Sequence, residues 1–282
     1  MRKLTIMVHL LIMNVEIPAN AQYFFASLLS FVTFDLIDLS PHIRKIFDLY
    51  DDEMSNENLS NLGYSSNYFI INIGSLLIVM AYLIFLLILY ACTWFIMNEK
   101  FMHYRNKIVD GLFWNKLISF VTEAYMQLTI SCLINFLSFK FTSVGTAISS
   151  SAAVVAFIVC LGFPVFSYCF LYRNRQNLET CEFKEKFESL YEGLNYKLGH
   201  FIVLAEPAFG FARVLFLIGS LVLLQSHPYF QIFVTNFTIT FIVIYTGLAS
   251  PYEEKSTSFF ENFNEVFIMI MTYHLICFAD LI

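Results

Sequence analysis

The chain has 282 residues, of which 58% are hydrophobic and only 13% are charged, and its formal net charge is −6. Soluble domains carry about 25% charged residues, so this composition excludes an ordinary soluble globular domain. Nucleic-acid binding requires a concentrated basic patch, which a net negative chain of this kind does not offer. We therefore expect the lipid bilayer, and not nucleic acid, as a partner.

Residues 1–67 are expected to form a membrane-proximal N-terminal segment. Arg2 and Lys3 precede a short apolar stretch, Leu4–Met13, and the small residues Ala19-Asn20-Ala21 follow it. This pattern is typical of a signal peptide with a small-residue cleavage site. The other interpretation is the end of a longer helix in a truncated gene product, and the resemblance described below favours it.

The rest of this segment is predicted to lie outside the membrane or at its surface. Residues 22–36 have the apolar spacing of an amphipathic surface helix, and Pro41 ends that pattern. An acidic loop, residues 48–57, is followed by a glycosylation sequon at Asn58.

Six apolar stretches, each long enough to cross a bilayer, make up most of residues 68–282. A spanning helix needs about 20 mostly apolar residues, and only helices and closed barrels satisfy their backbone hydrogen bonds in lipid. The predicted fold class is therefore all-α, a polytopic membrane helix bundle with about six transmembrane helices. The predicted spans are Phe69–Met97, Leu117–Phe139, Thr142–Leu171, Phe201–Leu224, Tyr229–Ser250 and Val266–Ile282.

The positions of lysine and arginine orient these spans. Orientation follows the Lys and Arg residues of short loops, which concentrate on the cytosolic side. Most of them lie in the connectors after the first, third and fifth spans: Lys100, Arg105, Lys107, Lys116, Arg173, Arg175, Lys184, Lys186, Lys197 and Lys255. We therefore expect these connectors to be cytosolic and both termini to be outside, in the plasma membrane or an endomembrane.

The third connector, about residues 173–198, is predicted to contain a short surface helix. Phe183, Phe187 and Leu190 recur at helical spacing among residues of alternating charge. Gly193 is expected to terminate this helix.

Ionisable residues inside the spans are the candidate functional residues, because they are costly in lipid and usually face a bundle interior or a hydrated cavity. Glu123 shares a face of the second span with Lys116 and Gln127, and Glu206 shares a face of the fourth with Arg213. Seven residues correspond to about 10 Å along a helix, which is far for Glu206 to pair with Arg213. A cross-helix pair of Glu123 with Arg213 is the candidate instead. Two interpretations stay open: a salt bridge that locks the bundle, and an ion or substrate path.

Prolines and small residues predict where the spans bend and where they pack closely. Pro164 and Pro207 lie within predicted spans and are expected to kink or unwind them. The small residues between Thr146 and Ala153 are expected to let neighbouring helices approach closely.

The sequence contains no recognisable motif for catalysis or cofactor binding. It has no phosphate-binding or dinucleotide-binding glycine loop, no nucleophile elbow, and no His/Cys cluster with metal-ligand spacing. We therefore expect no enzymatic activity, no catalytic residue, no cofactor and no bound metal.

Several short segments follow one another in a distinctive order between residues 16 and 280. They include Ile17-Pro18-Ala19-Asn20-Ala21, Asn61-Leu62-Gly63-Tyr64, Phe113-Trp114-Asn115, Leu190-Tyr191-Glu192-Gly193-Leu194 and Tyr273-His274-Leu275. This order resembles the C-terminal multi-pass region of large ciliate transmembrane surface proteins, which is similar to the TRP-like (polycystin-related, flavin-carrier-type) membrane domain. The resemblance implies a cation channel or transporter. It also implies that a long extracellular region precedes this part in other members.

The predicted topology departs from that of a six-helix tetrameric cation channel. Such channels place a re-entrant pore loop on the outer face between the last two spans, whereas the connector 251–265 is expected to be cytosolic here. The outer loop Gln225–Pro228 is too short to fold a selectivity filter. Glu253, Glu254 and Glu261 allow either a cytosolic acidic ring in an oligomer or a solvated loop.

The sequence thus predicts a TRP-like multi-pass membrane protein that mediates cation or small-solute permeation, with Glu123, Glu206 and Arg213 lining the path. Inorganic cations and further copies of the chain are its candidate partners. The alternative is a non-transporting anchor of a large adhesion or sensory protein, and a third class is an accessory subunit of an organellar membrane complex. A path requires a hydrated groove that reaches Glu123 and Arg213, whereas an anchor requires both residues to be sealed and paired.

Overall fold

The computed structural model describes residues 2–13, 39–49, 66–93, 114–196 and 201–278, together with residues 15, 20, 23–24, 59–60 and 64. Regular structure in these residues is helical, apart from a single bridge between Leu194 and Tyr252, which confirms the all-α class. The helices are α1 (Arg2–His9), α3 (Ser40–Phe47), α5 (Phe69–Asn72), α6 (Gly74–Thr93), α8 (Lys116–Leu137), α9 (Val144–Arg173), α10 (Cys181–Tyr191), α11 (Glu206–Leu223), α12 (Pro228–Ala249) and α13 (Lys255–Leu275).

Four helices in the described part of the chain are long and apolar enough to cross a membrane. They correspond to α8, α9, α11 with the 3-10 turn Val203–Ala205 before it, and α12. Their ends agree with the second to fifth predicted spans to within two residues. This agreement follows from their uniform hydropathy, because a long apolar run leaves little freedom in where a helix begins and ends.

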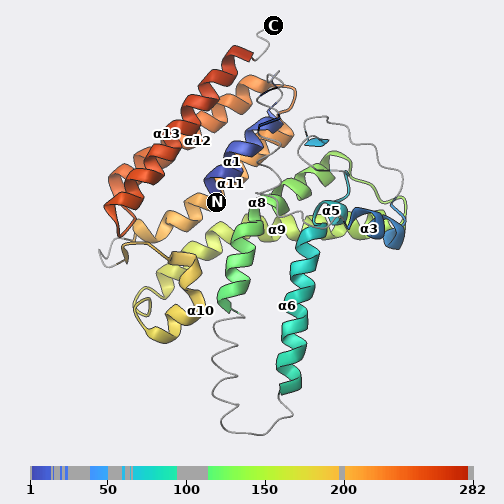
Figure 1. Ribbon diagram of the computed structural model, residues 1–282, viewed down its shortest axis with the longest axis horizontal. Helices are drawn as coiled ribbons and strands as arrows, with labels where there is room; N and C mark the ends of the chain where they lie inside the picture. Colours follow the sequence, from blue (N-terminus) through green and yellow to red (C-terminus); the bar gives the residue numbers. More distant parts are fainter. Residues whose placement is uncertain are drawn as a thin grey trace.

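The first predicted span is divided into two helices. α5 ends at Asn72, the backbone of the next residue, Ile73, leaves the helical region (φ −100°, ψ 16°), and α6 then begins at Gly74. Figure 1 shows α6 extending away from the other helices, and large apolar side chains on it such as Tyr82, Phe85 and Ile88 are exposed. A helix that is apolar all round belongs in a core or in a membrane. Residues 94–97 of the predicted span lie outside the described residues.

The last helix begins earlier than predicted. α13 starts at Lys255 rather than Val266, so the prediction that 251–265 is a connector was wrong for most of its length. The cause is the polar content of the first half of α13, which lowers its mean hydropathy. Glu265, Ile268 and Thr272 follow helical spacing and are all buried, so from Glu265 onward one face of α13 packs on the bundle.

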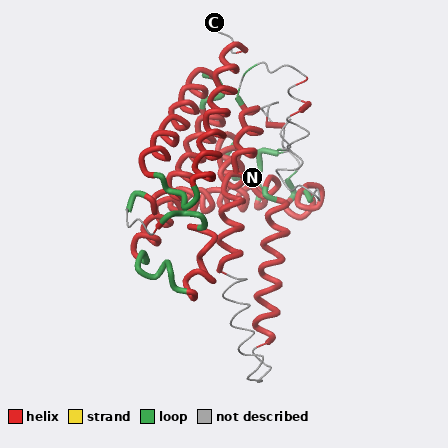
Figure 2. The backbone as a smooth tube through the Cα atoms, turned by 60° about the vertical axis from the view of Figure 1, so that its left-hand side comes forward, coloured by secondary structure: helices red, strands yellow, loops and turns green. Residues whose placement is uncertain are grey.

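α11 is the central helix of the bundle. It packs against α8, α9 and α12, while α12 also packs against α13 (Figure 1). The N-terminal residues 2–13 lie in the same core, where Val8 and Ile12 are fully buried together with Leu217 and Ile268. The apolar stretch near the N-terminus therefore packs inside the bundle, next to α11 (Figures 1 and 2). The predicted amphipathic helix 22–36 lies outside the described residues except for residues 23–24, and so do most of the acidic loop and Asn58.

The predicted surface helix of the third connector is confirmed as α10. Phe183 and Phe187 pack against Phe170 at the end of α9, with ring centroids 5.8 and 4.9 Å away. Gly193 follows the helix with a positive φ of 77°, which is a conformation that glycine adopts without steric cost.

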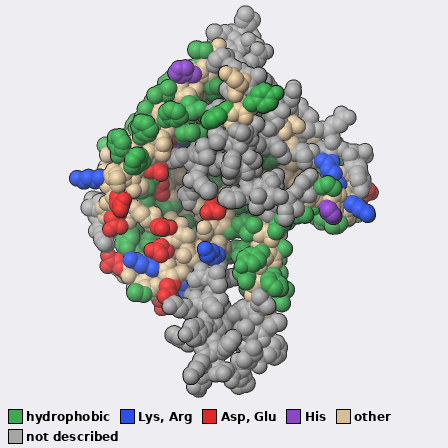
Figure 3. All heavy atoms as spheres, in the orientation of Figure 1, with side chains coloured by type: hydrophobic (Ala, Val, Ile, Leu, Met, Phe, Trp, Pro, Cys, Tyr) green, Lys and Arg blue, Asp and Glu red, His purple; other side chains and the backbone are tan. Residues whose placement is uncertain are grey.

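The connectors predicted to share one side of the membrane lie together at one end of the bundle. The backbone N–H of Asn195 donates to Pro251 O (2.7 Å), and that of Glu253 donates to Gly193 O (2.9 Å). At the start of α8, Asn115 Oδ1 accepts from the backbone N–H of Ser189 in α10 (3.0 Å). We call this end of the bundle, where the connectors meet, the connector end. Figure 3 shows charged side chains gathered there and near α3.

The two prolines do not interrupt the helices as predicted. Pro207 lies in the first turn of α11, after the 3-10 turn Val203–Ala205, where a proline costs no helical hydrogen bond. α9 continues through Pro164 as an unbroken helix, so of the two predicted effects, a kink or unwinding, the unwinding does not occur.

The predicted close packing at the start of α9 is confirmed. Ser143 and Thr146 form a reciprocal capping box that starts the helix, and Ser149 and Ala153 are fully buried. Gly145 is so close to α3 that an added Cβ would lie 1.8 Å from the carbonyl oxygen of Phe47.

Gly145→Ala should therefore destabilise the protein by about 1–3 kcal/mol, because the extra methyl group overpacks the contact between α3 and α9. Thermal unfolding in detergent measures the change. Gly162→Ala is the matched control in the same helix, because its Cβ would meet no atom within 4 Å and alanine favours a helix by about 1 kcal/mol over glycine. Equal melting temperatures for the two variants would contradict the docking of α3 on α9.

Candidate functional site

A buried ion pair joins α11 to α13. Arg213 of α11 is 5% exposed and Glu265 of α13 is 1% exposed, and Arg213 Nη1 donates to Glu265 Oε1. An arginine at the centre of a membrane helix costs about 2.5–3.5 kcal/mol on insertion scales, so its guanidinium requires a countercharge. Glu265 supplies it. The predicted pairing of Arg213 with Glu123 was wrong.

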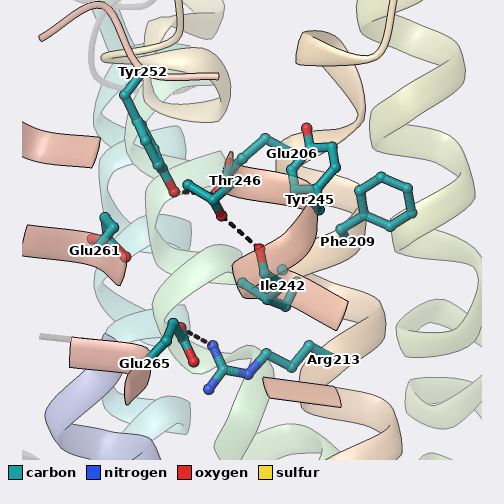
Figure 4. Close-up of a pocket in the computed structure, with 10 residues that line it drawn as sticks. Glu206, Phe209, Arg213, Ile242, Tyr245, Thr246, Tyr252, Glu261 and Glu265 are labelled. Carbon is teal, nitrogen blue, oxygen red and sulfur yellow. Dashed lines mark hydrogen bonds and ion pairs between the residues drawn. The ribbon is translucent and has the colours of Figure 1, made fainter. Parts of the chain in front are cut away.

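The ion pair borders a polar cavity of about 40 Å³ between α11, α12 and the start of α13. Such a volume holds a few water molecules at ~10–15 Å³ each, whereas sites for organic ligands occupy about 300–1,000 Å³. The residues that line it are Glu206, Phe209, Gly210, Arg213, Ile242, Tyr245, Thr246, Tyr252, Glu261 and Glu265. Figure 4 shows Tyr252 near Glu206 at one end of this group, Arg213 with Glu265 at the other, and Glu261 between them.

The end of the cavity nearest the connectors is bordered by Tyr252. Its hydroxyl group donates to Glu206 Oε1 at 2.8 Å, and its backbone is held by the bridge to Leu194 after α10. Burial, and then the nearby Glu206 carboxylate, raise the pKa of Tyr252 well above the ordinary value for tyrosine. Tyr252 therefore stays protonated at physiological pH and remains a hydrogen-bond donor.

The α12 side of the cavity is formed by groups that already have hydrogen-bond partners. Tyr245 Oη donates to Ile202 O (2.8 Å), and Thr246 Oγ1 donates to Ile242 O (2.7 Å) in its own helix. Phe209 packs edge-on against Tyr245, with ring centroids 4.8 Å apart. These residues form one wall of the cavity. The charged side chains form the rest of its polar lining.

Arg213 has more hydrogen-bond donors than Glu265 uses. Its Nε and Nη2 atoms are buried and have no hydrogen-bond partner among the residues that the structure describes. Buried donors of this kind are rarely left unsatisfied, and an ordered water or an ion is the usual explanation. The cavity beside the guanidinium is large enough to hold such a water.

The structure brings two of the three predicted site residues together. Glu206 and Arg213 both line the cavity, whereas Glu123 lies exposed on α8 and does not. On the same helix Lys116 is also exposed, and Gln127 donates to Asn72 O at 3.1 Å.

The α13 side of the site was not predicted from the apolar pattern of the sequence. Glu261 and Glu265 were assigned to a loop because they precede the apolar run that begins at Val266. Their spacing of four, continued by Ile268 and Thr272, is the signal that would have placed them on one helical face. The need of Arg213 for a countercharge was a second signal.

Comparison with known proteins gives no match: no family model matches the chain, and no curated protein or solved structure is significantly similar to it. The fold and the cavity therefore indicate the class of protein to which the chain belongs. It is an α-helical protein whose four long apolar helices are compatible with a multi-pass membrane protein, and it has a charged cavity between three helices. No group of three or more His, Cys, Asp or Glu residues in the described part is arranged to hold a metal ion. The resemblance to ciliate surface proteins and to the TRP-like domain stays a prediction.

Glu265→Gln should destabilise the protein by about 3–5 kcal/mol, because it leaves the Arg213 guanidinium buried without a countercharge. The double variant Arg213→Met, Glu265→Gln should recover most of this loss, since no charge then remains in that position. Thermal unfolding of the single and double variants in detergent measures the coupling. Glu123→Gln is the control, because an exposed side chain should change stability by less than about 0.5 kcal/mol. Additive effects of the two substitutions would contradict the ion pair.

Proposed function

We propose that the chain is a six-span membrane protein of the TRP-like kind that mediates permeation of cations or small solutes through its helix bundle. The observation that supports this is the cavity, which is lined by three carboxylates and one guanidinium and contains the buried pair Arg213–Glu265. Ionisable groups at such depth usually mark a substrate or ion pathway. The proposed route runs between α11, α12 and α13 and includes Glu206, Glu261 and Arg213.

Buried polar side chains extend beyond the cavity toward the opposite end of the same helices. Thr235 and Gln231 of α12 and Thr272 of α13 are fully buried, and Gln231 Nε2 donates across to Leu221 O of α11 at 3.0 Å. The threonine hydroxyl groups donate to carbonyl oxygens of their own helices. They therefore offer polar atoms along the route, and permeation requires these helices to separate.

The Arg213–Glu265 pair is suited to control that separation. It joins α11 to α13 across the proposed route, and separation of the two helices must break it. In the described conformation both side chains are almost fully buried, so this conformation corresponds to a closed state.

Ion flux into liposomes that contain the purified chain tests the proposed function. Glu206→Gln should lower the flux by about tenfold, equivalent to about 1.4 kcal/mol, because it removes a carboxylate from the cavity. Glu123→Gln should leave the flux unchanged, since Glu123 lies outside the cavity. No flux above empty liposomes, from protein that elutes as a folded species and unfolds cooperatively, would overturn the proposal.

The second candidate function is a non-transporting membrane anchor of a large adhesion or sensory protein. One observation favours it: Arg213 and Glu265 are sealed by packing and paired with each other, as a purely structural salt bridge would be. A folded protein that gives no flux would support this function.

The proposed six spans add α6 and α13 to the four long apolar helices, with the connector end in the cytosol and the N-terminus outside. Two single-cysteine variants test this orientation by labelling with a membrane-impermeant maleimide. Cys181, exposed on α10 at the connector end, should react only after the membrane is permeabilised. Ser226→Cys, exposed in the loop between α11 and α12, should react in intact cells. The reverse pattern would overturn the orientation. Equal labelling of both sites in intact cells would place them on the same side of the membrane, which would overturn the proposed crossing of α11 between them.

A further inference from the structure

The Arg213 guanidinium uses only one side of its hydrogen-bonding capacity. Nη1 donates to Glu265 Oε1, while Nε and Nη2 are buried and have no hydrogen-bond partner among the described residues. The N–H groups of Nε and Nη2 point the same way in the plane of the guanidinium and form a fork that binds a carboxylate through two parallel hydrogen bonds. The side of Arg213 that is best suited to a carboxylate is therefore not the side that Glu265 contacts.

A second carboxylate lies on the facing helix, one helical turn from the first. Glu261 of α13 precedes Glu265 by four residues and lines the same cavity as Arg213. Residues four apart share a face of a helix, with about 5–6 Å between their Cβ atoms. Figure 4 shows Glu261 between the Arg213–Glu265 pair and the Tyr252 end of the cavity. A turn of the long Arg213 side chain toward the connector end exchanges one carboxylate for the other.

Glu206 is less suited to this exchange than Glu261. It lies on the same helix as Arg213, seven residues earlier and therefore about 10 Å away along the axis, and it accepts a hydrogen bond from Tyr252. A pair within α11 would also not join α11 to α13. Glu261 is half-buried, and a carboxylate has lone pairs for about four hydrogen bonds, so it can accept the fork in addition to its other contacts.

The proposed permeation route gives such an exchange a physical reason. Separation of α11 and α13 breaks the bond between Arg213 and Glu265, and a guanidinium left buried without a countercharge is strongly destabilising. A partner one turn nearer the connector end removes this penalty for Arg213. Water that enters the opened route then hydrates Glu265. Exchange of the partner therefore lowers the free energy of the open conformation.

We propose that Glu261 is a second partner of Arg213 and that exchange of Glu265 for Glu261 regulates the opening of the proposed route. The inference rests on the proposed function and names the regulation of its site. In the described, closed conformation the guanidinium holds α13 through Nη1 and Glu265. In the open conformation the Nε–Nη2 fork holds α13 through Glu261.

A double-mutant cycle on stability tests the second pairing. Glu261→Gln alone should change the melting temperature in detergent by less than about 2 °C, because Arg213 is then paired with Glu265. In the Glu265→Gln background Glu261 is the remaining partner on α13, so the same substitution should lower the melting temperature by a further 4 °C or more, as a rough scale. If Glu265→Gln does not fold, Glu265→Asp takes its place, because it shortens the side chain and keeps its charge.

Glu254→Gln is the matched control for this cycle. Glu254 precedes α13, is exposed and lies outside the cavity. Its substitution should therefore have the same small effect in both backgrounds.

Ion flux in liposomes tests the regulation. Arg213→Lys keeps a positive charge beside Glu265 but lacks the planar fork. Glu261→Gln and Arg213→Lys should each lower the flux by about fivefold or more, and the double variant should conduct no less than the weaker single variant, because both substitutions remove the same contact. Glu254→Gln should conduct like the wild type.

The outcomes separate the inference from the proposed function. Equal effects of Glu261→Gln in the two stability backgrounds would overturn the second pairing, whatever the flux. Losses of flux that multiply in the double variant would overturn the regulation and retain the proposed permeation. No flux from any folded variant would overturn the proposed function and its regulation, while the stability cycle would still decide whether Glu261 pairs with Arg213.

Discussion

Burial of the Arg213 guanidinium within an apolar bundle is the constraint on which the arrangement of α11 and α13 depends. A charge at that depth must be paired, and Glu265 is the group that pairs with it. This contact turns Glu265 toward α11, while α13 packs mainly against α12. Glu261, one helical turn earlier on α13, lines the same cavity as Glu206 and Arg213.

The connector end couples the cavity to the surface of the bundle. Tyr252, which donates to Glu206, belongs to a short segment that is bridged to Leu194 after α10. α10 in turn holds the start of α8 through Ser189 and Asn115. Hydrogen bonds therefore connect Tyr252, the end of α10 and the start of α8 at this end of the bundle.

The outer surface of the bundle is apolar because lipid, not water, is the expected solvent there. Phe233 and Phe237 of α12 and Phe259 and Phe263 of α13 are all more than half exposed, and Figure 3 shows apolar side chains over this region, with charged side chains gathered at the connector end. In water such a surface would promote aggregation. In a bilayer this surface contacts lipid, and the polar groups lie between the helices.

The sequence by itself determined the all-α class, the ends of four long helices, the α10 surface helix and its glycine terminus. These features are local: hydropathy and helical spacing act within a window of 10–20 residues. Only the tertiary structure decided that α13 begins at Lys255, that residues 2–13 lie in the core, and that Arg213 pairs with Glu265 rather than Glu123. Which residue pairs with a buried charge depends on how the helices pack, and here the two paired residues are 52 positions apart in the chain. The first half of α13 is polar, and Glu265 at the end of that half is the buried residue that completes the pairing.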